Sequence, residues 1–264
     1  MSKITTSTLL KMKQQGEKIT TITAYDASFA KLFDSKGVDV ILIGDSLGMV
    51  LKGEPDTLAV TVAEIAYHTR AVSKGVERAF VIADMPFMSY GTPTDALHNA
   101  AQLMSAGASM VKVEGGEWLA NTITQLTQRG VPVCAHLGLT PQSVNKLGGY
   151  RVQGRDEEKA QAMIDHSKAL AAAGADCILL GCVPSSLGKA ITEAVDVPVI
   201  GIGAGSDTDA QVLVVYDMLG LGTGHTPKFV KNFMTDGRTP QQAIAAYGEE
   251  VKAGKFPSTE YAFS

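Results

Sequence analysis

Two apolar runs of this 264-residue chain end directly on carboxylates. Val40–Gly44 leads into Asp45 and Ser46, and Phe80–Ala83 leads into Asp84. Apolar runs of this length that are bounded by turn residues are typical of buried parallel strands. A buried carboxylate costs several kcal/mol unless it is paired or binds a metal. The two aspartates are therefore candidates for chemistry at the carboxyl ends of parallel strands.

A third run, Met110–Glu114, places a cation and an anion two residues apart. Lys112 and Glu114 share one strand face, and Val111 and Val113 share the other. The outer face of a covered parallel sheet packs on helices, so the valines belong there. We therefore expect Lys112 and Glu114 to point into the interior of a barrel, near its carboxyl mouth.

Each of these groups has a plain structural alternative. Asp45 alone could cap a helix, Asp84 alone could cap a loop, and Lys112 with Glu114 could be an ion pair that fixes strand register. Only their joint placement at one rim favours a shared site. A set of oxygen donors without a histidine cluster favours Mg²⁺ or a similar hard cation.

Three further segments could contribute to such a site. His136 ends a fifth apolar run, where a histidine either takes part in chemistry or bonds loop backbone. The segments Leu137–Ser143 and Gly148–Tyr150 form a long loop, which is either a functional lid or a plain connection. Gly201–Gly205 lacks the context of a dinucleotide fingerprint. We read it as a tight turn that lets a ligand or a helix approach closely.

Strand and helix patterns alternate along the chain without a change of composition, which predicts a single (β/α)8 TIM barrel over residues 1–264. The eighth strand is the least distinct, because Asp209–Val215 could instead begin a helix. The expected strands are Ile19–Ala24, Val40–Gly44, Phe80–Asp84, Met110–Glu114, Val131–His136, Cys177–Gly181, Val197–Gly203 and Val212–Tyr216. The expected helices between them are Asp26–Ser35, Val62–Ser73 with Thr61 as N-cap, Thr94–Ala106, Glu117–Gln128, Glu157–Ala173 and Ser185–Val195.

Two additions flank the eight units. Ser7–Gln15 predicts an extra N-terminal helix that covers the barrel bottom, and Gln241–Lys252 predicts a C-terminal helix. The segment Thr226–Ser264 exceeds what barrel closure needs. Its apolar residues lead us to expect a partner surface in a homo-oligomer, the residues being Phe229, Phe233, Ile244 and Tyr247.

Composition narrows the class of protein. The net charge is −4 with a pI of about 5.7, and Lys228 and Lys231 are the nearest approach to a basic patch, so we expect no nucleic-acid partner. No apolar run reaches membrane-spanning length, and the N-terminus has no signal-peptide pattern. Cys134, Cys177 and Cys182 lie in or beside apolar runs, as expected for reduced thiols in a cytoplasmic protein.

Motifs over essentially the whole length resemble one known family. They are Thr21–Asp26, Val40–Met49, Ala66–Thr69, Ala83–Phe87, Met110–Gly116, His136–Ser143, Gly148–Arg155, Gly201–Gly205 and Pro227–Phe229. With these residues the chain resembles the ketopantoate hydroxymethyltransferases. The resemblance implies transfer of a one-carbon unit from 5,10-methylenetetrahydrofolate to 3-methyl-2-oxobutanoate, giving 2-dehydropantoate for pantothenate and coenzyme A. It also implies a Mg²⁺-dependent barrel, assembled as a decamer and similar to phosphoenolpyruvate-mutase-type enzymes.

The resemblance also implies roles for individual residues. Asp45 and Asp84 would bind both the metal and the substrate, and Glu114 would support the metal directly or through water. Ser46 and Lys112 would hold the substrate carboxylate. The metal would act as a Lewis acid on the oxo acid and stabilise the enolate that forms when C3 loses a proton.

At one position the chain departs from the family pattern. The family carries its proton-accepting glutamate in a Leu-Glu-Cys-Val-Pro context, whereas this chain has Gly181 between Leu180 and Cys182. Glycine cannot accept a proton, and a positioned general base contributes about 10²–10⁴-fold in rate. His136 is a possible supporting residue, while Cys182 lies on the opposite strand face. Impaired transfer, a folate-independent 2-oxo-acid lyase or mutase, and a non-catalytic substrate-binding protein all stay open.

Overall fold

The computed structural model describes residues 2–222, 224 and 226–264. Eight parallel strands pair in sequence order, and β8 closes the barrel on β1. The predicted (β/α)8 barrel is therefore confirmed. The strands are β1 Ile19–Thr23, β2 Val40–Ile43, β3 Phe80–Asp84, β4 Met110–Glu114, β5 Val133–Gly138, β6 Cys177–Gly181, β7 Val199–Ile202 and β8 Ala210–Leu213.

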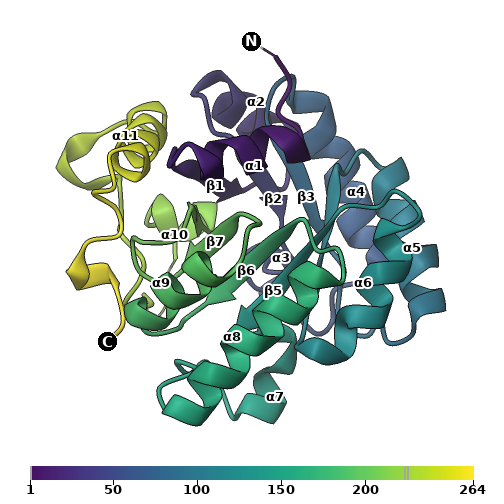
Figure 1. The fold of residues 1–264 in the computed structure, drawn as a ribbon. Helices are drawn as coiled ribbons and strands as arrows, with labels where there is room; N and C mark the ends of the chain where they lie inside the picture. Colours follow the sequence, from purple (N-terminus) through teal and green to yellow (C-terminus); the bar gives the residue numbers. More distant parts are fainter. Residues whose placement is uncertain (1, 223, 225) are drawn as a thin grey trace.

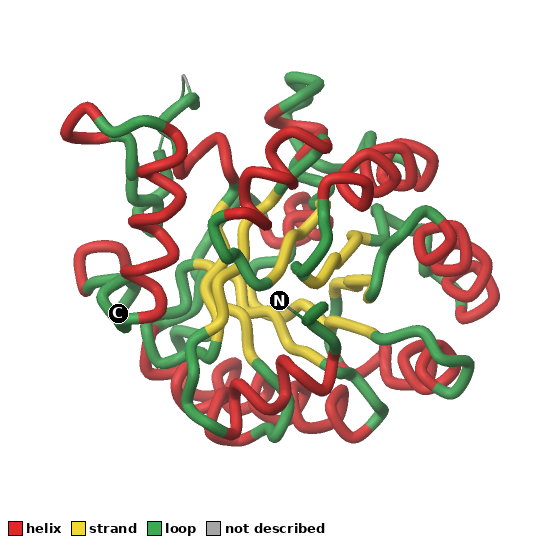
Figure 2. Tube along the Cα trace, turned by 90° about the horizontal axis from the view of Figure 1, so that it is seen from above, coloured by secondary structure: helices red, strands yellow, loops and turns green. Residues whose placement is uncertain are grey.

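Helices surround the strands, which gather at the centre of the molecule in Figure 2. The α-helices are α1 Thr6–Gln14, α2 Ala27–Ser35, α3 Leu47–Val50, α4 Val62–Gly75, α5 Pro93–Ser105, α6 Ala120–Thr127, α7 Val144–Leu147, α8 Glu157–Ala172, α9 Ser185–Ala194, α10 Val215–Met218 and α11 Pro240–Lys252. Short 3₁₀ turns are η1 Glu117–Leu119, η2 Pro141–Ser143, η3 Thr235–Gly237 and η4 Thr259–Tyr261. The predicted N-cap of α4 is confirmed, because Thr61 and Glu64 form a reciprocal capping box.

Strand alternation separates two apolar layers. Outward residues such as Val111 and Val113 pack with the surrounding helices. Inward residues such as Leu42 and Ile82 form a second cluster inside the barrel, which Leu9 of α1 joins. The N-terminal helix therefore covers the amino-terminal end of the barrel, as the sequence predicts (Figure 1).

The predicted bounds of the eighth strand are wrong. The strand occupies Ala210–Leu213 rather than Val212–Tyr216, and the helix α10 begins at Val215. The Val215 amide donates to Thr23 Oγ1 at 3.0 Å, so the chain has left the ladder with β1 by this point. A one-turn helix and a short strand share the same apolar residues, and periodicity does not separate them over so few positions.

The C-terminal segment folds back on its own barrel. Phe233, Ile244 and Tyr247 are almost completely buried within the chain. The Tyr247 hydroxyl lies 2.7 Å from the carbonyl oxygen of Thr21 and 2.8 Å from that of Gln211. The expectation that these apolar residues need a partner surface is therefore wrong, because they pack into the core of their own chain.

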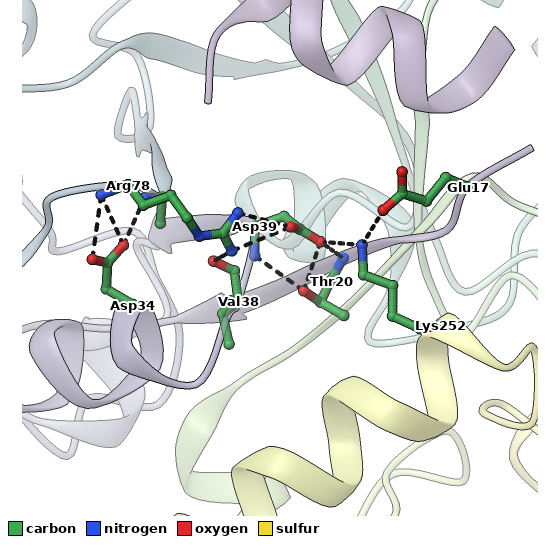
Figure 3. Close-up of polar contacts among 8 residues, drawn as sticks. Glu17, Thr20, Asp34, Val38, Asp39, Arg78 and Lys252 are labelled. Carbon is green, nitrogen blue, oxygen red and sulfur yellow. Dashed lines mark hydrogen bonds and ion pairs between the residues drawn. The ribbon is translucent and has the colours of Figure 1, made fainter. Parts of the chain in front are cut away.

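A charged cluster ties α11 to the amino-terminal end of the barrel (Figure 3). Asp39 lies 2.7 Å from Lys252 Nζ and 3.3 Å from the Arg78 guanidinium, and it accepts a bond from the Thr20 amide at 3.0 Å. Lys252 also pairs with Glu17 at 3.1 Å. Two cations therefore face two anions, and the charges of this bottom cluster balance.

Candidate active site

A cavity of about 540 Å³ opens at the carboxyl ends of the strands. This is the end of a (β/α)8 barrel where active sites lie. The structure brings all seven residues singled out in the sequence into its lining, namely Asp45, Ser46, Asp84, Lys112, Glu114, His136 and Gly181. They come from five different strands or the turns that follow them, so closure of the barrel is what assembles the set.

A hydrogen bond links the two aspartates of the site. Asp84 is the last residue of β3, and its Oδ2 accepts the Asp45 amide at 3.0 Å. Both side chains are at least 96% buried. The turn between β2 and α3 thus directs Asp45 toward Asp84. The neighbouring Ser46 hydroxyl lies 2.8 Å from the Tyr25 hydroxyl.

Lys112 lies between two carboxylates, as its inward strand position predicts. Its Nζ is 3.0 Å from Glu114 Oε1 and 3.2 Å from Asp84 Oδ1. Glu114 Oε1 also lies 3.0 Å from His136 Nδ1, and Oε2 accepts the Gln142 amide at 3.0 Å. Both oxygens of Glu114 therefore already have partners within the chain.

Gln142 is a site residue that the sequence analysis did not single out. Its side-chain amide donates to Asp45 Oδ2 at 2.8 Å and to the Met85 carbonyl at 2.9 Å, and its Oε1 accepts from the Tyr90 hydroxyl. It belongs to η2, in the loop that follows β5. Membership of that loop was the only sequence signal, because a lone glutamine in a turn has no distinctive spacing.

The electrostatics of the cluster are unbalanced toward negative charge. Burial raises the pKa of Asp45 well above its usual range, and the nearby Asp84 and Glu114 raise it further. Burial likewise raises the pKa of Asp84, against the opposing effect of Lys112. Burial also disfavours ionised Glu114, but Lys112 and His136 outweigh it and lower the pKa to about 2. Despite burial, the surrounding carboxylates hold the pKa of Lys112 above its usual value.

The donor set fits one further cation. Three buried carboxylates face one lysine, and a divalent ion would favour the ionised form of Asp45, whose pKa is raised by burial and by the neighbouring carboxylates. No three His, Cys, Asp or Glu side chains among the described residues already form a ready-made ion site. Both oxygens of Glu114 accept hydrogen bonds, whereas Asp84 Oδ1 accepts none among the described residues and Asp45 accepts one through Oδ2. Asp45 and Asp84 are therefore the side chains with capacity to hold an ion.

His136 presents an unpartnered nitrogen to the cavity. Its ring is 95% buried, and Nε2 finds no hydrogen-bond partner among the residues that the structure describes. Because Glu114 is a carboxylate, Nδ1 is the nitrogen that donates to it, which leaves Nε2 as the acceptor of the neutral ring. The Glu114–His136 pair therefore holds a proton acceptor at the wall of the cavity.

Gly181 lies at the end of β6 beside this nitrogen. A Cβ at this position would lie 2.8 Å from His136 Nε2 and 2.5 Å from the Leu139 carbonyl oxygen. The Leu139 amide donates to the Gly181 carbonyl at 2.6 Å, which holds the loop after β5 against the glycine. The space that a side chain at 181 would need is thus taken up by backbone.

Cys182 does not replace the missing base. It lines the cavity, but burial raises the pKa of its thiol to about 12. The thiol is therefore protonated at neutral pH and has no capacity to take a second proton. The sequence-based exclusion of Cys182 rested on strand parity, and that reason is wrong, because Cys182 follows the end of β6 and lines the cavity. The conclusion holds because of the raised pKa of the thiol.

Fold and site together define a (β/α)8-barrel protein with an acidic, lysine-containing cavity at its carboxyl mouth. Solved structures with this fold include phosphonopyruvate hydrolase, with a TM-score of 0.63, 18% identity, and 83% of this chain and 84% of that chain covered. They also include 2,3-dimethylmalate lyase, a PEP mutase/isocitrate lyase superfamily member, with a TM-score of 0.62, 16% identity, and 95% and 98% covered. At this identity the likeness concerns the fold alone.

The family is shown by sequence. Residues 3–259 match the ketopantoate hydroxymethyltransferase family. A 3-methyl-2-oxobutanoate hydroxymethyltransferase of Shewanella sp. (strain W3-18-1) is 62% identical over the full length of both chains. The protein of that name from Shewanella oneidensis is 61% identical, again over the full length of both. The chain belongs to the ketopantoate hydroxymethyltransferase family.

Proposed function

We propose that this chain transfers a hydroxymethyl group from 5,10-methylenetetrahydrofolate to 3-methyl-2-oxobutanoate, giving 2-dehydropantoate. Family membership supports the reaction. The observation that carries the proposal is the convergence of the seven candidate residues in one cavity. In the cell we expect the reaction to serve pantothenate synthesis.

Asp45 and Asp84 are the residues that would hold Mg²⁺, since their charge is the least neutralised in the cluster. Glu114 would support the site indirectly, because both of its oxygens already accept bonds. When bound, Mg²⁺ acts as a Lewis acid on the keto oxygen and carboxylate of the oxo acid. Lys112 supplies the chain's own positive charge to the substrate carboxylate, and Ser46 supplies a hydroxyl donor.

His136 is the residue that we assign to accept the proton from C3 of the oxo acid. Gly181 offers no acceptor, whereas His136 lines the cavity and its buried Nε2 has no hydrogen-bond partner within the described chain and lies beside position 181. A histidine that is oriented by a carboxylate is a familiar general base. Since it does not occupy position 181 itself, we expect transfer to be slower than with the glutamate, by up to about 10²–10⁴-fold.

We also propose a large homo-oligomer, the decamer that the sequence resemblance implies. The buried C-terminal residues no longer support it, but exposed apolar side chains elsewhere do. They are Met49, Leu51, Tyr67, Phe87, Met88, Trp118 and Tyr150. The three cysteines are buried and free, as expected for a reducing cytoplasm. Light scattering that gives a single chain of about 28 kDa would contradict the assembly.

Turnover with both substrates and Mg²⁺ tests the function. We expect formation of 2-dehydropantoate, and we expect oxo-acid binding in calorimetry to disappear with EDTA. Cleavage of 2-dehydropantoate to 3-methyl-2-oxobutanoate without any folate would instead indicate a lyase. Binding without turnover at any protein concentration would indicate a non-catalytic protein.

Exchange of the C3 proton in deuterium oxide, without folate, tests the role of His136 separately. His136→Gln should slow the exchange at least tenfold and leave oxo-acid binding intact. Exchange at the parent rate in His136→Gln would exclude His136 as the acceptor, without touching the transfer reaction itself.

A further inference from the structure

The cavity has two chemically different ends. Its inner end carries the charged cluster around Lys112. Its outer end is formed by apolar side chains from the loop after β5, from the end of β7 and from the C-terminal segment. They are Leu139, Pro141, Tyr150, Val152, Ile202, Phe229 and Phe263. The five-carbon oxo acid occupies only the charged end of a cavity of about 540 Å³, so the apolar end is available for the second substrate.

An aromatic pair builds the wall of the outer end. The rings of Phe229 and Phe263 meet edge to face, with centroids 6.4 Å apart and planes at 65°. Both rings pack against Gly203, where an added Cβ would lie 3.0 Å from Phe263 Cε2 and 3.1 Å from Phe229 Cδ1. Gly203 also has a φ of +63°, which side chains rarely adopt. The glycine turn after β7 therefore makes room for these two rings.

The C-terminal segment is fastened at this wall. The amide and the hydroxyl of Ser185 both donate to the Phe263 carbonyl, at 2.9 and 3.0 Å. Ser185 begins α9, beside which the end of the chain lies in Figure 1. These bonds fix the main chain of Phe263, while its half-buried ring remains part of the cavity lining.

A positive charge stands at the rim of the same wall. Lys228 is exposed, lines the cavity, and places its Nζ 5.6 Å from the centre of the Phe263 ring. The inner end of the cavity is negative, so Lys228 gives the outer rim the opposite sign. A ligand with a flat ring and an anionic tail complements both features.

We propose that Phe229 and Phe263 hold the flat ring of the one-carbon donor, with its anionic glutamate tail at Lys228. The proposal rests on the proposed function and locates its second substrate. Contact between an aromatic side chain and a heteroaromatic ring contributes enough affinity for its loss to be measured. The one-carbon donor then approaches the oxo acid from the apolar end of the cavity, and the oxo acid binds at the charged end.

Calorimetric titration with tetrahydrofolate tests the aromatic wall. Phe263→Ala should weaken binding at least tenfold, and Phe263→Tyr should bind within threefold of the parent. Tyr261→Ala is the matched control, because it removes a ring from the same segment but outside the cavity lining. An equal loss in Tyr261→Ala would overturn the role of the Phe263 ring.

A second titration separates ring from tail. Lys228→Gln should weaken tetrahydrofolate binding severalfold and leave binding of 6-methyltetrahydropterin, which has no glutamate tail, unchanged. Equal affinity of the parent and Phe263→Ala for tetrahydrofolate would overturn the inference and leave the proposed function standing. A parent protein that binds no tetrahydrofolate, and forms no product, would overturn both.

Discussion

The two ends of the barrel each carry a charged cluster, but the clusters differ in charge balance and in burial. At the bottom, Asp39 and Glu17 face Arg78 and Lys252 (Figure 3). At the mouth, three carboxylates face one lysine, Lys112. Both clusters lie at strand ends and pair carboxylates with basic side chains. Lys252 and Glu17 at the bottom are 33% and 53% exposed, whereas the paired side chains at the mouth are at most 6% exposed.

The difference lies in what the chain leaves unneutralised. Every charge in the bottom cluster has an opposite charge within the chain, which fits a role in fastening α11 to the barrel. The mouth retains excess negative charge. Burial raises the pKa values of Asp45 and Asp84, and for Asp45 the neighbouring carboxylates Asp84 and Glu114 add to the rise. Without a further cation such a site lowers the stability of the folded protein, and binding of the cation raises it.

Substitution at position 181 should have the largest effect on kcat, because the mouth lacks a basic carboxylate at this position. We compare Gly181→Glu with Gly181→Gln, which has the same bulk but no basic carboxylate. Both must displace the Leu139 backbone, so both should lose about 1–3 kcal/mol of stability. The kcat of Gly181→Glu should exceed that of Gly181→Gln by about 10²–10⁴. Equal kcat values in the two variants would mean that a carboxylate at 181 does not act as the base.

The clash at position 181 marks the limit of what the sequence could predict. Strand parity correctly placed Lys112 and Glu114 in the interior, because alternation is a property of every strand. It gave no indication that the Leu139 carbonyl packs on Gly181, since that contact depends on the path of the loop after β5. For the same reason Gln142 was missed, although it bonds three segments of the site.

Lys112→Ala should have the next largest effect. It leaves the carboxylates of the mouth without their only lysine, and breaking a buried ion pair costs about 3–5 kcal/mol. Calorimetry should show oxo-acid affinity reduced at least 100-fold and tetrahydrofolate affinity changed less than threefold. Lys112→Arg keeps the charge and controls for unfolding. Equal losses for the two ligands would make Lys112 a structural residue, like Arg78 at the bottom.

A pair of isosteric changes tests the comparison directly. In metal-free protein, Asp45→Asn should raise the free energy of unfolding by about 1 kcal/mol, because it removes one of three repelling carboxylates. Asp39→Asn should lower it by about 2 kcal/mol, because it leaves Arg78 and Lys252 without their shared partner. Urea unfolding in EDTA measures both. Destabilisation of similar size in the two variants would mean that the mouth is balanced after all.

The smallest expected effect is a difference between Asp45→Asn and Asp39→Asn in how stability depends on pH. A carboxyl whose pKa is raised on folding holds its proton more tightly in the folded state, so stability falls as pH rises from about 4 through the raised pKa. Glu114, with a pKa of about 2, acts in the opposite sense, but only below about pH 4.5. Metal-free protein should therefore lose stability through Asp45 and Asp84 as pH rises above about 4.

Asp45→Asn should lose less stability than the parent as pH rises, because it lacks one of the two carboxyls whose pKa is raised on folding. Asp39→Asn should follow the parent curve in parallel, because its change lies at the other end of the barrel. Saturating Mg²⁺ should flatten the parent curve toward that of Asp45→Asn, because a bound cation favours the ionised carboxylates that low pH would otherwise protonate. Urea unfolding at each pH, with EDTA or with Mg²⁺, gives the three curves. Parallel curves for the parent and Asp45→Asn would remove the electrostatic distinction between the two ends of the barrel.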